Sequence, residues 1–308
     1  MTKSTKSDLF PKSITHYTLV EVLHDLAPRS AYHFALYEDS NKKKYLCKLW
    51  TGEHKDQNYT WIVNEIAVYK SFSSVYKKHS TEITTTFPEI NIPQMVHQEL
   101  SDTKAFLLTE YIEGSILDYE SQNKKSEVLL RVIQYFNLLS PFLKKEPHNI
   151  MKLGIFPLFV RFHYYLLKVV LSGVINLKSI IKMIIPFYLG LPELLKNQDS
   201  IFVHRDLGFA DNVLLKNQQI FIIDFQLSVL TNPLMEIANV TVATWQEKEF
   251  RENFLSSNYI QNLLSSRSAR KQYKALVIYA FLVSTSLGIE KGQFKGNLNK
   301  ITKFSHSL

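Results

Sequence analysis

The pattern of hydrophobic and polar residues divides the chain into a strand-like first third and a largely helical remainder. Short runs rich in aromatic and β-branched residues predict five strands, at 16–22, 32–37, 45–50, 94–99 and 105–110. A turn is predicted at 38–43, and an amphipathic helix runs from Asp56, its predicted N-cap, to about Phe72. Residues 73–92 are polar and are predicted to be irregular.

The apolar spacing becomes helical after Gly114. One helix is predicted from about residue 126, and the long apolar stretch 155–191 predicts two or more core-facing helices. Residues 201–229 form a strand-rich segment, and helices resume over 233–289. The predicted fold class is therefore α+β, with a small antiparallel sheet and one helix followed by a larger helical part.

The strand-rich segment carries the candidate chemistry. It reads Phe202-Val-His-Arg-Asp-Leu-Gly-Phe-Ala-Asp-Asn-Val-Leu-Leu215, followed by Ile220-Phe-Ile-Ile-Asp-Phe-Gln226. A turn at 216–219 makes the second part return along the first, so the hairpin is predicted to bring Asp206, Asn212 and Asp224 to one edge. Phosphoryl transfer from ATP needs a carboxylate at the acceptor hydroxyl, which suits Asp206, and oxygen ligands for Mg²⁺, which suit Asn212 and Asp224.

This pattern resembles the HxD…N catalytic loop and the ID[FW] metal strand of the aminoglycoside phosphotransferase and choline kinase group, which shares the protein kinase fold. The resemblance implies a two-lobe fold with a small antiparallel-sheet N-lobe containing one helix and a larger helical C-lobe. We expect a disordered tail at 1–13, a nucleotide-binding N-lobe at 14–112, and a C-lobe at 113–308 that holds the catalytic loop, the metal site and the acceptor site.

One spacing departs from the family pattern. Asp206 and Asn212 are six residues apart, whereas the family normally has five. The following Val-Leu-Leu favours Asn212 as the counterpart of the family's asparagine, and Asp211 remains the alternative metal ligand.

The resemblance extends upstream to the candidate nucleotide site. Lys48 lies in the third predicted strand, like the phosphate-contacting lysine of this fold, and Glu65 on the next helix matches the glutamate that pairs with it. The loop at 24–31 contains no glycine, although glycine lets backbone amides approach phosphates closely. Arg29 and Ser30 are the candidates for contacting phosphate in its place.

Three further assignments follow from the resemblance. The segment 107–114 is similar to the family's hinge, which implies that backbone groups near Glu110 and Ile112 meet the adenine edge. Glu236 is interpreted as structural support for the catalytic loop, and His204 as a residue that packs and holds this loop rather than a base. Gln226 stands where protein kinases have the glycine of Asp-Phe-Gly, but only Asp224 is needed for the metal.

The resemblance implies an ATP- and magnesium-dependent kinase with Asp206 as catalytic base and an alcohol group as acceptor. About nine residues separate Asp224 from Pro233, too few for a long activation segment or a peptide platform. A small or lipid-linked acceptor is therefore predicted rather than a protein. Four aromatic residues before the catalytic loop are candidates for lining the acceptor pocket, although core packing is the favoured interpretation: Phe159, Phe162, Tyr164 and Tyr165.

The charge is unevenly distributed. The net charge is +8, with +5 in each of the segments 115–200 and 236–308 and −1 in each of the two remaining segments. A cationic acceptor prefers an acidic site, so a sugar-like or anionic acceptor is favoured, and the same charge suits peripheral contact with an anionic membrane surface. The alternative function is a pseudokinase that serves as a nucleotide-binding or scaffold module. The basic charge also suggests nucleic-acid binding, but no recognisable motif accompanies it, so no nucleic-acid partner is predicted.

A cytoplasmic location is predicted, with peripheral membrane contact as an option. Cys47 is the single cysteine, so no intramolecular disulfide forms, and the first residues contain no apolar segment typical of a secretory signal. The longest uncharged apolar run, 275–289, is shorter than the roughly 18–20 residues that span a bilayer. It is predicted to be a buried helix. The oligomeric state stays open.

Overall fold

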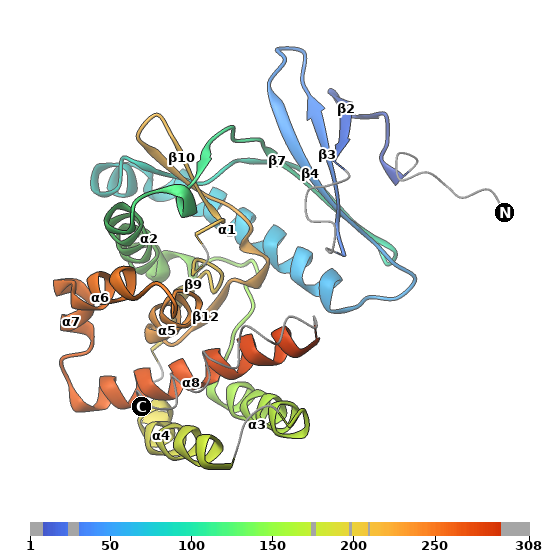
Figure 1. Cartoon of the computed structure of the whole chain (residues 1–308). Helices are drawn as coiled ribbons and strands as arrows, with labels where there is room; N and C mark the ends of the chain where they lie inside the picture. The colour runs from blue at the N-terminus through green and yellow to red at the C-terminus, as the bar shows by residue number, and fades with distance from the viewer. Residues whose placement is uncertain (1–8, 24–30, 174–176, 197–198, 209, 291–308) are drawn as a thin grey trace. The chain divides into compact units, whose positions relative to one another are not determined.

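The computed structural model describes residues 9–23, 31–173, 177–196, 199–208 and 210–290 of the chain. It separates into two compact units, whose elements are labelled in Figure 1. The first unit comprises Met1–Ser115, Lys145–Ile150 and Leu214–Leu227, and the second comprises Ile116–Lys144, Met151–Val213 and Ser228–Leu308.

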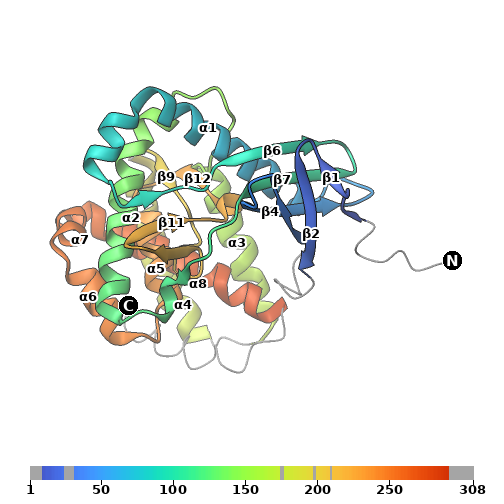
Figure 2. The same cartoon turned by 90° about the horizontal axis from the view of Figure 1, so that it is seen from above.

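A six-stranded antiparallel sheet forms the centre of the first unit, in the order β1-β2-β3-β4-β7-β6 (Figure 2). Its strands are β1 (Ser13–Ile14), β2 (Tyr17–Leu23), β3 (His33–Glu38), β4 (Lys44–Thr51), β6 (Met95–Leu100) and β7 (Lys104–Glu110). Aromatic and β-branched residues form these strands because their side chains pack well on a pleated surface. The predicted strands and the predicted sheet are confirmed.

The N-terminal residues correct one expectation. Phe10 is 4% exposed and packs in the core of the sheet. The Tyr37 hydroxyl donates to the Pro11 carbonyl (2.8 Å), and the Leu19 amide donates to the Lys12 carbonyl (2.9 Å). The prediction of a disordered tail was therefore wrong for residues 9–13, because a buried aromatic side chain and backbone hydrogen bonds fix them. Residues 1–8 lie outside the described residues.

Helix α1 (Gln57–Thr86) is longer than the sequence pattern predicted. Asp56 is its N-cap, as predicted, and accepts a backbone hydrogen bond from the first turn (2.8 Å). The prediction of irregular structure for 73–92 was wrong over most of this segment, although His79 has non-helical dihedral angles. Tertiary packing outweighs the polar composition here, since Ile83 is fully buried near the end of the helix.

A second sheet explains why residues 214–227 belong to the first unit. Its strands are β5 (Ile90–Asn91), β8 (Ser115–Ile116), β10 (Val213–Lys216) and β11 (Gln219–Ile222), in the order β5-β11-β10-β8. Strand β11 pairs in parallel with β5, and the short helix η3 (Phe225–Leu227) packs against α1. The expected division at residues 112 and 113 lies near Ser115, but the hairpin expected in the C-lobe groups with the first unit through these contacts.

The second unit is mostly helical. Its helices are η2 (Leu117–Tyr119), α2 (Gln122–Leu143), α3 (Ile155–Leu171), α4 (Leu177–Lys196), α5 (Leu234–Ala243), α6 (Lys248–Ser256), α7 (Asn258–Leu263) and α8 (Arg267–Glu290). Strands β9 (Ile201–Val203) and β12 (Val229–Thr231) pair antiparallel. Helix α8 packs against α3, α4 and α5, and α2 packs against β9 and α6 (Figure 1). The predicted helices and strand-rich insert are confirmed.

The apolar run predicted to be a buried helix lies within α8. Residues 275–282 are each 0–7% exposed. Their helix contacts α4 and α5, which accounts for apolar side chains around its circumference. The buried-helix interpretation is confirmed for these residues. Across the described residues, no helix is long and apolar enough to cross a membrane.

Candidate functional site

Lys48 is the centre of a buried polar cluster in the first unit. Strand β4 carries this side chain, which is 9% exposed. Its Nζ donates to Glu65 Oε2 (2.8 Å), to Asp224 Oδ1 (2.8 Å) and to Gln226 Oε1 (2.9 Å). An ammonium group has three N–H donors, so these three acceptors satisfy it completely. The predicted pairing of Lys48 with Glu65 is present.

The two carboxylates of this cluster stabilise the charge of Lys48. Burial alone would lower the pKa of Lys48, but the negative charges of Asp224 and Glu65 outweigh burial and raise it. Burial raises the pKa of Glu65 to about 7, and the Lys48 charge opposes this rise. Lys48 is therefore a permanent cation. Its ring neighbour Tyr32, 4.5 Å away, adds a further favourable contact.

Asp224 has a backbone conformation that is uncommon for non-glycine residues. Its φ is +59°, in the left-handed region. The next residue, Phe225, is fully buried and packs on two aromatic rings of α1, Tyr69 (5.4 Å) and Phe72 (5.2 Å). This packing holds the turn that brings the Asp224 carboxylate to Lys48. Strained backbone of this kind concentrates at functional sites.

The loop after β9 holds Asp206 in the second unit. His204 is fully buried and stacks on Phe136 of α2, with ring centroids 6.2 Å apart. Arg205 has a φ of +71°, and its backbone amide donates to Glu236 Oε2 (2.9 Å) from α5. These contacts are the ones required for His204 to pack the loop and for Glu236 to support it.

Glu236 is a buried carboxylate with no cation bonded to it among the described residues. Burial raises its pKa to about 7, although backbone hydrogen bonds from Arg205 and His204 act in the opposite direction. Within the described part of the chain, its second oxygen, Oε1, has no hydrogen-bond partner. Burying a charged group away from water is unfavourable, so the protonated form of Glu236 is more stable here than the ionised form.

Asn212 lies directly against Asp206. Its Nδ2 donates to the Asp206 carbonyl oxygen (3.0 Å) and to Asp206 Oδ2 (3.1 Å). Asn212 is 8% exposed, whereas Asp211 is exposed to solvent. The side chain that the structure brings to Asp206 is therefore Asn212. Since its nitrogen is used in these bonds, the amide oxygen is the atom left for a metal.

Gly208 is a loop residue that sequence reasoning missed. A Cβ atom there would lie 2.4 Å from the Ala243 side chain and 3.1 Å from the Asn239 carbonyl oxygen, both on α5. Glycine is required because the loop passes so close to the helix. Its position two residues after Asp206 was the available signal.

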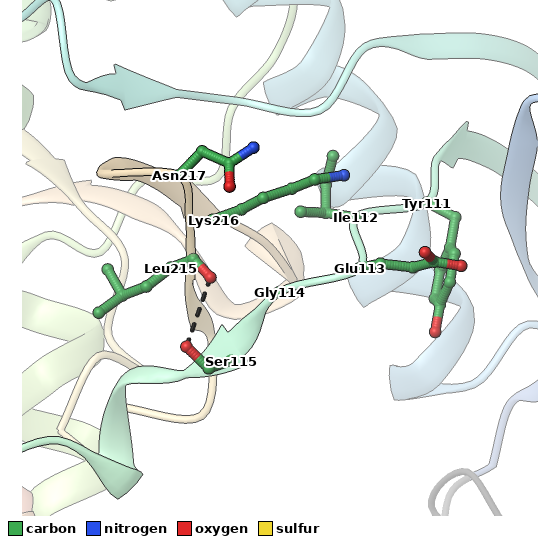
Figure 3. Close-up of a pocket in the computed structure, with 8 residues that line it drawn as sticks. All are labelled: Tyr111, Ile112, Glu113, Gly114, Ser115, Leu215, Lys216 and Asn217. Carbon is green, nitrogen blue, oxygen red and sulfur yellow. Dashed lines mark hydrogen bonds between the residues drawn. The ribbon is translucent and has the colours of Figure 1, made fainter.

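The predicted hinge lines an open pocket of about 530 Å³ together with the turn between β10 and β11 (Figure 3). Its lining residues are Tyr111, Ile112, Glu113, Gly114, Ser115, Leu215, Lys216 and Asn217. Ile112 is thus at the pocket. The Glu110 side chain instead pairs with Lys43 and accepts a hydrogen bond from the Gln94 amide (2.9 Å). The other two predicted phosphate contacts, Arg29 and Ser30, lie outside the described residues.

The four aromatic candidates for the acceptor pocket differ in burial, and Phe159 and Tyr165 are half-buried. Phe162 is fully buried and stacks on Phe187 of α4 (3.5 Å), so core packing is confirmed for it. Tyr164 is 52% exposed and does not pack in the core. The predicted core-facing helices of the stretch 155–191 are therefore present, and each has an exposed side as well.

A second buried lysine was also missed. Lys125 of α2 is 2% exposed and pairs with Asp118 (2.6 Å) and Glu247 (3.0 Å). Its Nζ lies 5.4 Å from the centre of the Phe250 ring. Glu247 is 122 residues away in the sequence, so no local pattern could identify this cluster.

Comparisons with known proteins agree with the fold and with the resemblance. Residues 184–267, which include the predicted catalytic loop, Asp224 and Glu236, match the model of the phosphotransferase enzyme family. The comparison with curated proteins gave no match. The predicted α+β, protein-kinase-like fold is confirmed by similarity to solved phosphotransferases, and the predicted class, a kinase with an alcohol group as acceptor, agrees with both findings.

Three solved structures illustrate the similarity. A thermostable mutant of aminoglycoside phosphotransferase APH(4)-Ia in its apo form is 13% identical, with a TM-score of 0.60 over 94% of this chain and 95% of that one. A further variant of that enzyme, in a ternary complex with ADP and hygromycin B, is 13% identical with a TM-score of 0.59 over 93% and 94%. Choline kinase LicA from Streptococcus pneumoniae is 16% identical, with a TM-score of 0.56 over 94% of each chain.

Proposed function

We propose that the protein is an ATP- and magnesium-dependent phosphotransferase that phosphorylates a hydroxyl group of a small or lipid-linked molecule. The observation that carries the proposal is the buried cluster of Lys48 with Glu65 and Asp224. In this cluster a permanent cation lies beside a carboxylate in strained backbone. A phosphate-binding lysine and a metal-binding carboxylate need this kind of pairing.

The nucleotide is assigned to the first unit. Lys48 is proposed to contact the α- and β-phosphates with Glu65 fixing its direction, and the segment at Glu110 and Ile112 to meet the adenine edge. Arg29 and Ser30 are proposed phosphate contacts. Because all three donors of Lys48 already have acceptors, a phosphate oxygen has to replace one, and neutral Gln226 is the weakest of them. The APH(4)-Ia complex with ADP supports a nucleotide on this fold.

The donor atoms suit magnesium. Mg²⁺ prefers carboxylate and amide oxygens. Asp224 and Asn212 are the proposed ligands, and Asp211 is the alternative to Asn212. The Asn212 contact with Asp206 supports the first choice, since it leaves the amide oxygen available. When bound, the metal neutralises charge on the phosphate oxygens.

Asp206 is the proposed catalytic base. Its Oδ2 accepts from Asn212, which orients the carboxylate that is proposed to take the proton of the acceptor hydroxyl. The loop that carries Asp206 is fixed by the Glu236 contact and by close packing at Gly208. Positioning of this kind is most of what a protein contributes to phosphoryl transfer.

The acceptor is proposed to be sugar-like or anionic. Residues 115–200 and 236–308 each carry a net charge of +5, which attracts anions. Among the similar proteins, one is in a complex with hygromycin B and another is a choline kinase, so the fold alone does not determine the acceptor. A cytoplasmic location and a lipid-linked acceptor at a membrane surface belong to this proposal.

The test is transfer of the γ-phosphate from ATP to a panel of hydroxyl acceptors with and without Mg²⁺. We expect Asp206→Asn to lower the rate about 10²- to 10⁴-fold while Mg·ATP still binds. Asn212→Ala is expected to raise the magnesium requirement, and Asp211→Asn to leave it unchanged; the reverse result would make Asp211 the ligand. Absence of magnesium-dependent transfer to every acceptor would sink the proposal.

A pseudokinase is the second candidate, and one observation favours it. Lys48 is fully occupied by protein acceptors, one of which, Gln226, stands at a position where protein kinases have glycine. A nucleotide-binding or scaffold module needs no turnover. Stabilisation by Mg·ATP without transfer to any acceptor would favour this candidate.

A further inference from the structure

Helix α3 exposes apolar side chains on the face opposite its buried one. The exposed residues recur every three or four positions, which places them on one stripe: Phe156 (76%), Val160 (50%), Tyr164 (52%), Leu167 (57%) and Leu171 (76%). The buried residues Leu158, Phe162 and Val169 form the opposite side. Packing within the second unit therefore uses only half of the apolar surface of this helix.

Helix α4 has the same two-sided character. Its exposed apolar residues are Ile181, Ile185, Tyr188, Leu189 and Leu195, which are 44–58% exposed. Met183, Phe187 and Leu194 are buried on the other side. Helices α3 and α4 thus share an unusual feature, an exposed apolar side opposite a buried one.

The two exposed stripes join into one surface. Phe162 and Phe187 stack between the helices, and the His163 Nε2 and Tyr188 hydroxyl atoms lie 2.7 Å apart at their shared edge. Both helices pack on α8 (Figure 1). We infer that their buried sides face α8 and that the exposed stripes lie on the other side. We call the exposed apolar residues of these two helices the α3–α4 face.

This concentration is not the ordinary scatter of apolar residues over a surface. Among the described residues, eleven of the sixteen exposed large hydrophobic side chains lie on α3 and α4. Single exposed apolar residues need no explanation, but contiguous patches mark interaction sites.

The charges beside the α3–α4 face are almost all positive. Helix α3 contains Arg161 and Lys168 and no acidic residue, and Lys168 Nζ lies 4.6 Å from the Tyr164 ring centre. Helix α4 contains Lys178, Lys182 and Lys196 against the single acid Glu193, which accepts a hydrogen bond from Ser268. Helical spacing puts Arg161, Lys168 and Lys182 at the borders of the stripes.

We propose that the α3–α4 face docks on the surface of an anionic lipid bilayer and lies in the interface without crossing it. Aliphatic side chains would enter the boundary of the acyl region, while lysines reach lipid phosphates and tyrosines lie at headgroup level. Charge complementarity favours an anionic bilayer as the binding partner, because the α3–α4 face has apolar stripes bordered by cations and the bilayer has an apolar layer bordered by anions. The inference stands independently of the phosphotransferase activity.

The test is flotation of the full chain with phosphatidylcholine vesicles, with and without phosphatidylglycerol. The wild type is expected to float with the anionic vesicles, more weakly at high salt. Leu167→Gln combined with Leu171→Gln is expected to lower the partition coefficient about tenfold or more, and Lys178→Gln with Lys182→Gln about fivefold per lysine. Val20→Gln with Leu100→Gln, exposed apolar positions of the first unit, is the matched control and is expected to bind normally.

Two results would overturn the proposal. The wild type could fail to float with anionic vesicles, or the Leu167 and Leu171 variant could float as well as the wild type. If that variant also converts a dimer in solution to monomers, the face is assigned to a second copy of the chain. Circular dichroism checks that each variant keeps its helices. Unfolding is not expected of the Leu167 and Leu171 variant, because both side chains are exposed.

Discussion

Each unit buries one lysine between two carboxylates, and the two lysines differ in what surrounds them. Lys48 in the first unit pairs with Glu65 and Asp224, whose side chains are 4% and 31% exposed. Lys125 in the second unit pairs with Asp118 and Glu247, which are 48% and 33% exposed. The two carboxylates that pair with Lys125 are partly exposed to solvent, whereas the Glu65 carboxylate is buried.

The comparison of the Lys48 and Lys125 clusters shows which features of a buried ion cluster indicate a functional site. Lys125 joins the start of α2 to Glu247, the N-cap of α6, and a structural role explains all its contacts. Lys48 has a third, neutral acceptor in Gln226, and Asp224 reaches it from left-handed backbone. A buried lysine is therefore weak evidence for a site. A replaceable acceptor together with backbone strain is stronger evidence.

The largest effect on stability is expected where the cation is removed. Lys48→Met leaves Glu65 beside Asp224 without a counter-charge, so the free energy of unfolding should fall by about 3–5 kcal/mol. Lys125→Met should cost about 1–2 kcal/mol, because solvent screens its more exposed carboxylates. Urea denaturation of both variants measures the two losses, and equal losses would contradict the distinction between the clusters.

Glu236 extends the comparison to a buried carboxylate that has no lysine. Its pKa in the folded protein is about 7, above the unfolded value of about 4.5, so the folded state holds the proton more tightly. Its contribution to stability is fully present below about pH 4.5 and is lost as pH rises to about 7, by at most about 3 kcal/mol. It is constant above that.

Glu236→Gln removes this titration. The unfolding free energy of the wild type relative to the variant should therefore fall between about pH 4.5 and pH 7 and then level off. Chemical denaturation of both proteins at several pH values gives this difference directly. A difference that does not change with pH would show that Glu236 stays ionised in the folded protein.

The smallest effect is expected at the neutral acceptor of Lys48. Gln226→Ala removes one hydrogen bond and leaves both ion pairs, so stability should fall by only about 0.5–1.5 kcal/mol. Affinity for Mg·ATP should stay the same or increase, since the phosphate no longer competes with Gln226. Calorimetric titration measures this, and a clear loss of affinity would mean that Gln226 itself contacts the nucleotide.

Local patterns predicted most of the fold, because strands and helices differ in the period of their apolar residues. They failed where distant packing decides. The second half of α1 is polar, yet Ile83 is fully buried there. Phe10 is also buried, and the residues next to it in the sequence give no sign of the core in which it packs. The sequence pattern also could not predict the exposed stripes of α3 and α4, since a helix with apolar residues on all sides is usually interpreted as a buried helix.

The candidate site residues of each unit were predictable to the extent that they lie in contiguous motifs. Lys48, Asp206, Asn212 and Asp224 stand in or beside strands whose spacing indicates their chemistry. The bond from Lys48 to Gln226 joins residues 178 positions apart, and no local pattern encodes it. The requirement for glycine at position 208 can be recognised only once the position of α5 is known, because residues of that helix leave no room for a side chain.

Calorimetric titration with Mg·ATP tests the central claim most directly, since it needs no knowledge of the acceptor. The wild type and Lys125→Met are expected to bind the nucleotide equally well. Lys48→Met is expected to bind about ten- to a hundredfold more weakly, because a charge-assisted hydrogen bond to phosphate is lost. A wild type that does not bind Mg·ATP, or a Lys48→Met variant that binds it as tightly, would contradict the assignment of this cluster to the nucleotide.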